Sequence, residues 1–232
     1  MLIGGFQKLT LLDYPGHLAA IIFTAGCNMR CGHCYNAEFV LPEKIKKIPL
    51  IKEKDVIDVL ETRKKFLEGV VISGGEPTLQ PDLEDFIKKL KNMKYKVKLD
   101  TNGLRPKILK KLFQNGLLDY IAMDLKSSFE KYAQIAGVSI DTSALQESIK
   151  IIMNSGVDYE FRTTVIPKYH DEAELEKMLE LISGAKSYAL QQFIPKNTLD
   201  PEMEKEKSFN KKMFDAFAAI AKKHVSNVEV RV

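Results

Sequence analysis

The sequence predicts an α/β fold in which parallel strands alternate with helices, and three observations lead to this expectation. Short apolar runs rich in β-branched residues recur along the chain, as is typical of strands buried on both faces. The segments between them repeat their apolar residues at helical spacing. No linker, low-complexity tract or change of composition interrupts the alternation, so the 232 residues are expected to form one domain, 1–232.

Six strand-like runs define the predicted sheet, and several of them end at glycine or proline. The runs are 18–24, 69–73, 95–99, 119–123, 159–166 and 187–194. Their alternation with helices implies parallel pairing and right-handed crossovers. We therefore predict a partial (β/α)6 TIM-type barrel of parallel strands, with a doubly wound open sheet as the alternative.

Six segments have the apolar periodicity of helices. They are 52–67, 81–90, 105–115, 143–155, 175–182 and 208–223. The last of them is a C-terminal helix, and 228–232 is expected to follow it as a short terminal strand. Segment 40–51 is predicted to be a loop because Pro42 and Pro49 flank its basic middle.

Composition and charge limit the kinds of partner that the protein is expected to bind. The net charge is +4, and the lysines are spread along helix-like segments, which is typical of solvated faces rather than of a nucleic-acid-binding stripe. The N-terminus lacks a basic segment followed by a long apolar one, and no apolar run approaches the roughly 20 residues that span a bilayer. We therefore expect a cytoplasmic protein with neither a nucleic acid nor a membrane as partner.

All three cysteines of the chain lie close together, directly after the first predicted strand. Cys27, Cys31 and Cys34 have the spacing C-x3-C-x2-C within a predicted cluster loop at 25–38. In a reducing cytoplasm such a group is typical of a metal site rather than of disulfides. A structural zinc site takes four ligands, and His33 is badly placed to be the fourth. A closed four-iron cluster also takes four thiolates, whereas three leave one iron open to a substrate or cofactor.

Unusual polar residues stand where the predicted strands end. In a barrel the carboxyl ends of the strands share one face, on which active sites are built. The candidates are Gly74, Gly75 and Glu76 after the second strand, Asp100, Thr101 and Asn102 after the third, Asp124 and Lys126 after the fourth, and Arg162 on the fifth. The alternative interpretations are a plain glycine turn for the first group and ordinary ion pairs for the charged residues.

The cysteine spacing, followed by Gly-Gly-Glu-Pro at 74–77, resembles the radical S-adenosylmethionine (SAM) superfamily. Four further motifs make the chain similar to the glycyl-radical-enzyme activases: Asp-Tyr-Pro-Gly at 13–16, Leu-Asp-Thr-Asn-Gly at 99–103, Met-Asp-Leu-Lys at 123–126, and Phe-Arg at 161–162 with Pro167. Within that group the chain most resembles the compact activating proteins of anaerobic ribonucleoside-triphosphate reductase.

The resemblance implies a reaction. Cys27, Cys31 and Cys34 would bind three irons of a [4Fe-4S] cluster, and SAM would chelate the fourth. One electron would cleave SAM to methionine and a 5′-deoxyadenosyl radical, which takes a hydrogen atom from a glycine Cα of a glycyl radical enzyme. The implied partners are that enzyme, here anaerobic ribonucleotide reductase, and a flavodoxin or ferredoxin as electron donor.

Three alternatives stay open. The chain is also similar to activases of other glycyl radical enzymes, such as the pyruvate formate-lyase type. A second alternative is a radical SAM enzyme that acts on a small molecule, such as 7-carboxy-7-deazaguanine synthase. The third is a non-catalytic module for metal binding or electron transfer.

The resemblance also implies roles for individual residues. Gly74, Gly75 and Glu76 would bind the methionyl amino group of SAM, and Asp100, Asp124 and Lys126 would surround its ribose and carboxylate. Asp100, Thr101 and Asp124 would hold a monovalent cation. His33 would contact the adenine. Asn102 and Arg162 belong to the same predicted cofactor site, as do Tyr35 and Asn36, which stand where activases more often have histidine and asparagine.

Some residues are left without a chemical role. No function is assigned to Gln191 or Gln192. His17, His170 and His224 are expected to be ordinary loop or surface residues. The turn at 13–16 either receives the glycine loop of the partner or is a plain β-turn.

Overall fold

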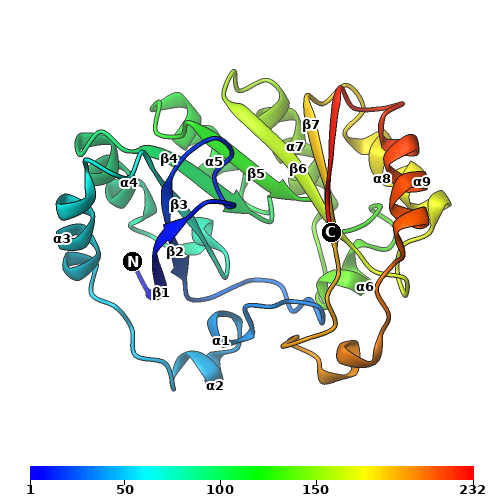
Figure 1. Ribbon diagram of the computed structural model, residues 1–232, viewed down its shortest axis with the longest axis horizontal. Coiled ribbons are helices and arrows are strands. Elements are labelled where there is room, and N and C mark those ends of the chain that lie inside the picture. Colours follow the sequence, from blue (N-terminus) through cyan, green and yellow to red (C-terminus); the bar gives the residue numbers. More distant parts are fainter. The chain divides into compact units, whose positions relative to one another are not determined.

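The computed structural model describes residues 1–232 and confirms the α/β class. Figure 1 labels most of its elements, which in chain order are β1 (Ile3–Thr10), β2 (Ala19–Thr24), α1 (Ala37–Val40), α2 (Pro42–Ile45), α3 (Glu53–Arg63), β3 (Gly69–Gly74), η1 (Pro77–Leu79), α4 (Leu83–Asn92), β4 (Lys96–Thr101), α5 (Pro106–Gln114), β5 (Tyr120–Asp124), α6 (Tyr132–Ala136), α7 (Thr142–Met153), β6 (Asp158–Val165), α8 (Glu172–Leu181), β7 (Ser187–Gln192), η2 (Pro201–Lys205), α9 (Lys211–Ala221) and β8 (Asn227–Arg231). None of the helices has the length and apolar character that crossing a membrane requires.

The chain divides into two compact units. Unit 1 comprises residues 1–28, 38–101 and 107–121, and unit 2 comprises 29–37, 102–106 and 122–232. We describe each unit by itself, and the single domain 1–232 stays a prediction.

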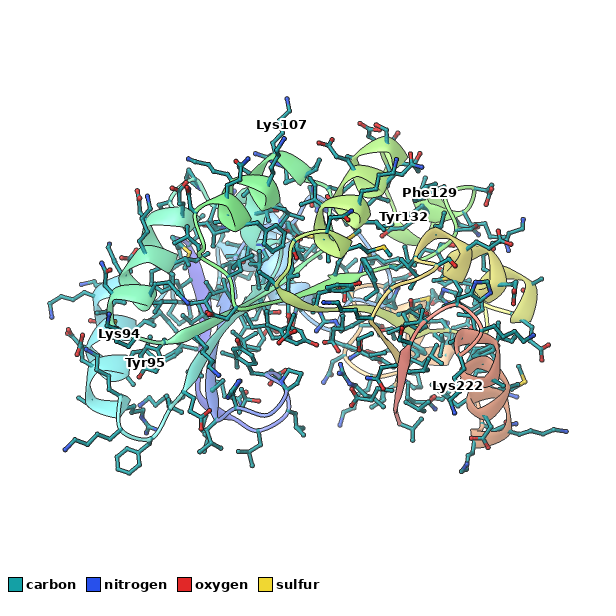
Figure 2. The ribbon with its side chains drawn as sticks, turned by 90° about the horizontal axis from the view of Figure 1, so that it is seen from above. Lys94, Tyr95, Lys107, Phe129, Tyr132 and Lys222 are labelled. Atoms are coloured by element: carbon teal, nitrogen blue, oxygen red, sulfur yellow. The ribbon has the colours of Figure 1, made fainter.

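Unit 1 contains the first strands of the sheet, in chain order. β2 pairs in parallel with β3, and β3 pairs in parallel with β4, as the alternation with helices predicted. β1 is an additional strand that pairs antiparallel with β2. β1 was not predicted, because this edge strand is buried only at Ile3 and Thr10 and contains Gly4 and Gly5. At the turn into β4, Lys94 has a φ of 70°, and the hydroxyl of Tyr95 donates to the Leu60 carbonyl oxygen at 2.7 Å (Figure 2).

Unit 2 contains the last strands, again in chain order. β6, β7 and β8 pair in parallel, so the predicted terminal strand is confirmed. α8 packs against α9, and α9 packs against β7 and β8 (Figure 1). β1 and β8 each pair with one strand only, so the strands do not close into a complete barrel. This agrees with the predicted partial barrel.

The loop predicted at 40–51 is partly helical, so that prediction was wrong in detail. α2 begins at Pro42, and proline suits the first turn of a helix because its missing N–H would have no partner there. Helices of four or five residues, such as α1, α2 and α6, are too short to show an apolar period in the sequence.

The turn at 13–16 is anchored to the core of unit 1 by Tyr14, while Pro15 and Gly16 are exposed. It connects β1 to the amino end of β2, whereas Thr24 and Gly74 lie at the carboxyl ends of their strands. Tyr14 is buried against Ala19, Ile21 and Val71, and the Asp13 carboxylate accepts a hydrogen bond from the Thr10 hydroxyl. These contacts support the β-turn interpretation.

Candidate active site

The glycines after β3 are packed too tightly to carry side chains. Gly74 has a φ of 110°, and a Cβ there would lie 2.3 Å from the backbone nitrogen of Thr24. A Cβ on Gly75 would lie 2.1 Å from the carbonyl oxygen of Gly26. Two backbone hydrogen bonds hold this contact, from Gly75 N–H to the Thr24 oxygen and from Glu76 N–H to the Gly26 oxygen, both 2.8 Å. The glycine loop therefore rests on the peptide that directly precedes Cys27.

Glu76 is buried, and its carboxylate orientation is defined by neighbouring threonines. Its Oε1 accepts from the backbone N–H of Thr78 at 3.1 Å, from the Thr78 hydroxyl at 2.5 Å and from the Thr101 hydroxyl at 2.8 Å. Thr101 ends β4, so two of the predicted site residues meet within unit 1. The position of this carboxylate is fixed before any cofactor arrives.

Asp100 has a partner that sequence reasoning missed. Lys98, two residues earlier on β4, donates to the Asp100 carboxylate at 2.7 Å, and both side chains are buried. The Lys98 ammonium also lies 5.7 Å from the centre of the Tyr120 ring. The position of Lys98 between the apolar residues Val97 and Leu99 was the available signal for this pair. The predicted grouping of Asp100 with Asp124 and Lys126 stays a prediction, since those two residues belong to unit 2.

The loop that carries Cys31 and Cys34 is held by backbone hydrogen bonds within unit 2. Cys34 N–H donates to the Cys31 carbonyl oxygen at 3.0 Å. Arg30 N–H donates to the Ala136 oxygen at 2.7 Å, and Asp200 N–H donates to the Gly32 oxygen at 2.9 Å. All three cysteines are thiols rather than disulfides. Burial raises the pKa of Cys31, while the charge of Lys126 opposes that rise.

His33 is a buried, neutral imidazole. Burial, together with the nearby charge of Lys126, lowers its pKa to about 3. Its Nδ1 atom has no hydrogen-bond partner. A buried ring nitrogen without a partner is costly, and a bound group with a donor would satisfy it.

Tyr35 and Asn36, which follow the third cysteine, differ in how far they are exposed to solvent. Tyr35 is 42% exposed; its hydroxyl oxygen accepts from Ile194 N–H at 2.8 Å and its ring stacks on Phe193. This side chain therefore ties the cysteine loop to the segment after β7. Asn36 is half-buried beside it.

Asp124, Lys126 and Arg162 form one cluster in unit 2. Arg162 Nε donates to Asp124 Oδ1 at 2.9 Å, and Lys126 Nζ lies 3.5 Å from Asp124 Oδ2. Burial alone would raise the pKa of Asp124, but Arg162 and Lys126 outweigh it and lower the pKa to about 2. Burial would likewise lower the pKa of Lys126, but Asp124 and Cys31 outweigh it and raise that pKa. The cluster is therefore fully charged near neutral pH.

Asn102 has a structural contact of its own. It is buried, and its Oδ1 accepts from Leu104 N–H at 3.1 Å, which forms a turn at the end of β4. Gln192, which received no role, donates from Nε2 to the Phe209 carbonyl oxygen at 2.9 Å.

His170 lies in a loop, as expected, but it is not a surface residue. This histidine is buried, and both of its ring nitrogens have partners: Nδ1 accepts from Ile166 N–H at 2.9 Å, and Nε2 lies 3.0 Å from the Lys126 carbonyl oxygen. By contrast, His17 pairs with Glu68 and His224 with Glu176 at partly exposed positions. Nothing in the local sequence separates His170 from these two.

Glu174 supports a prediction about acid stability. Burial would raise its pKa, but hydrogen bonds from Ser127, Ser128 and Lys131 outweigh it and lower the pKa from 4.5 to about 2. A lowered pKa stabilises the fold above about pH 4.5, and this stabilisation is lost as the pH falls toward 2. We expect Glu174→Gln to reduce the free energy of unfolding by about 2–3 kcal/mol at pH 7.

Urea unfolding of both proteins between pH 7 and pH 3 measures this effect. The difference between wild type and Glu174→Gln should shrink steadily below pH 5. The exposed Glu172 begins the same helix, so Glu172→Gln is the matched control, with a change within about 0.5 kcal/mol. A constant difference across the pH range would contradict the assignment.

Comparisons with known proteins give one family. Residues 21–182 match the Radical SAM superfamily. The chain is 35% identical over 235 residues to a protein of Methanocaldococcus jannaschii described as a putative glycyl-radical enzyme activating enzyme, across 99% of this chain and 95% of that protein.

Two solved structures share the fold. SuiB of Streptococcus suis is 14% identical, with a TM-score of 0.66 over 91% of this chain and 48% of its own. A domain of the pyruvate-formate lyase-activating enzyme from Bacteroides vulgatus is 17% identical, with a TM-score of 0.56 over 71% of this chain and 99% of its own. Both agree with an incomplete α/β barrel.

Proposed function

This chain belongs to the radical SAM superfamily, and from that premise we propose that it is an activase that generates a glycyl radical on a partner enzyme. The observation that carries the proposal is the 35% identity, over nearly the whole chain, to a relative with that description. Superfamily membership implies a [4Fe-4S] cluster and SAM as cofactors.

The residues present fit this cofactor pair. Cys27, Cys31 and Cys34 offer three thiols, the number that leaves one iron of a four-iron cluster open. The positive charge of Lys126 acts on Cys31 and Cys34, which suits thiolates that bind metal. The unpartnered Nδ1 of His33 suits a donor such as the adenine amino group. When bound, the cluster and SAM supply a 5′-deoxyadenosyl radical after one-electron reduction.

The protein's own groups position SAM and exclude water. Gly74 and Gly75 bring backbone close to the methionyl amino group, and Glu76 accepts from it. Lys126 neutralises the SAM carboxylate, while Arg162 keeps Asp124 ionised near the ribose. Tyr35, Asn36 and Asn102 complete the proposed site, and a monovalent cation beside Asp100, Thr101 and Asp124 is part of the same proposal.

The proposed substrate is a glycine Cα–H bond of anaerobic ribonucleoside-triphosphate reductase. The opening Ile-Gly-Gly-Phe-Gln-Lys-Leu-Thr at 3–10, followed by Asp-Tyr-Pro-Gly at 13–16, resembles the activating proteins of that reductase, and this supports the choice over other glycyl radical enzymes. The reaction consumes one electron, for which we propose a flavodoxin or ferredoxin as donor.

The test is anaerobic incubation of reconstituted protein with SAM, a chemical reductant and the reductase from the same source. We expect SAM to change the EPR spectrum of the reduced cluster, and a doublet glycyl signal to appear on the reductase. A reductase variant without its radical glycine is the control and should give no doublet. Formation of 5′-deoxyadenosine without a protein radical on any glycyl radical enzyme would overturn the activase assignment. If SAM left the spectrum of the cluster unchanged, the assignment as an enzyme that uses SAM would be overturned as well.

A further inference from the structure

The segment 124–128, which carries Asp124 and Lys126, begins at the last residue of β5 and has no helix or strand from 125 onward. Its backbone groups therefore need partners other than the regular hydrogen bonds of a helix or a sheet. Leu125 has two of them on β6: its N–H donates to the Arg162 carbonyl oxygen at 2.8 Å, and its own oxygen accepts from the Thr163 hydroxyl at 2.7 Å. β6 thus fixes the first half of the segment.

His170 holds the next peptide. The Lys126 carbonyl oxygen can only accept, so Nε2 of His170 carries the proton and donates across 3.0 Å. Nδ1 is then the acceptor for Ile166 N–H at 2.9 Å. One neutral tautomer satisfies both bonds, and the imidazole connects the Lys126 peptide to the end of β6.

Glu174 holds the two residues that follow. Its Oε1 accepts from the Ser127 hydroxyl at 2.7 Å and from Ser128 N–H at 2.8 Å. Glu174 is the third residue of α8 after the capping residue Asp171. In a capping box such a carboxylate would return to the N–H of the capping residue, whereas here it bonds to the segment beyond β5.

Tyr132 also contacts the backbone of segment 124–128. Its hydroxyl donates to the Asp124 carbonyl oxygen at 3.2 Å and lies 3.4 Å from the Lys126 nitrogen. The ring is buried at the start of α6, where Figure 2 labels it. Side chains from α6, β6 and the start of α8 therefore surround the segment.

The Lys126 side chain is far less constrained than its backbone. Its ammonium has three N–H donors, and its hydrogen bond to Asp124 is long, at 3.5 Å. The charge is thus available to an incoming carboxylate, and its position depends on the backbone that His170 and Glu174 hold.

We propose that His170 and Glu174 are positioning residues that hold the Lys126 peptide so that its ammonium is in place for the SAM carboxylate. This inference rests on the proposed function, because it takes SAM as the ligand of Lys126. It assigns to the start of α8 a role in cofactor affinity, in addition to its packing.

The experiment measures SAM binding to the reconstituted, oxidised protein by calorimetry, so that no turnover is involved. His170→Asn keeps an acceptor for Ile166 N–H but cannot reach the Lys126 oxygen, and we expect the Kd for SAM to rise about tenfold. His170→Gln can place its amide nitrogen near the original Nε2, and we expect a Kd within about threefold of wild type. The iron content of both variants should stay unchanged.

A double-mutant cycle separates positioning from packing. If His170 acts through Lys126, adding His170→Asn to Lys126→Met should change the Kd by less than about twofold. His224→Asn is the matched control, because His224 bonds to Glu176 on the same helix, α8, and its loss should leave the Kd unchanged. If His170→Asn does not fold, Ser127→Ala removes a single hydroxyl from Glu174 and should still weaken binding about threefold.

Each outcome bears on one of the two proposals. Wild-type affinity in His170→Asn, or equal weakening by His224→Asn, would overturn the positioning role. An undiminished effect of His170→Asn in the Lys126→Met background would also overturn it. A wild-type protein that binds no SAM would instead overturn the proposed function.

Discussion

Replacing Cys31 with alanine is expected to abolish cluster assembly. The chain has only three cysteines, so no spare thiol can take its place. Two thiolates do not hold a four-iron cluster. Anaerobic reconstitution should give about four irons per wild-type chain and fewer than about one in Cys31→Ala. Formation of 5′-deoxyadenosine from SAM should fall to the background without enzyme.

The loss should be chemical rather than a failure to fold. Cys31 is 6% exposed, and removing one buried sulfur atom costs about 1 kcal/mol, a modest part of the stability of a domain. Circular dichroism of the apoprotein should therefore match wild type. Met29→Leu in the same loop is the control, since it conserves a buried apolar volume and should keep all of the iron. Wild-type iron content in Cys31→Ala would rule out the ligand assignment.

Every strand except β1 was predictable, because each of the others carries its own signal. β2 is apolar from Ala19 to Phe23 and largely buried, and it pairs in parallel with β3 as such a run should. β1 carries no such signal, since an edge strand alternates weakly and is stabilised mainly by its partner. The sequence therefore predicts the inner strands and β8 better than the edge strand β1.

The charged residues of the candidate site were predictable from the sequence, whereas the residues that position them were less so. Glu76 and Asp124 stand at strand ends, where the alternation of strands and helices marks them. Lys98 and His170 received no role, because their burial depends on contacts that a local pattern does not encode. His170 contacts Lys126, which lies 44 residues earlier in the chain. A histidine in a loop before a helix does not indicate such a partner.

The second large effect concerns the glycine loop. Gly75→Ala is expected to reduce the free energy of unfolding by about 3 kcal/mol and to weaken SAM binding by tenfold or more. The new Cβ would lie 2.1 Å from the Gly26 carbonyl oxygen, which is backbone and cannot rotate away. Either β3 or the peptide before Cys27 must move, so iron content should fall as well. Urea unfolding, iron analysis and calorimetry with SAM measure the three consequences.

Gly116→Ala is the matched control for this prediction. A Cβ at Gly116 meets no atom within 4 Å, but the φ of 62° still strains an alanine there, at a cost of about 1 kcal/mol. Both variants add one methyl group to unit 1, yet only Gly75→Ala presses it against the cysteine loop. Gly116→Ala should therefore lose a little stability and keep its iron and its SAM affinity. Equal iron and SAM affinity in the two variants would show that the close approach of Gly75 to Gly26 has no part in building the cofactor site.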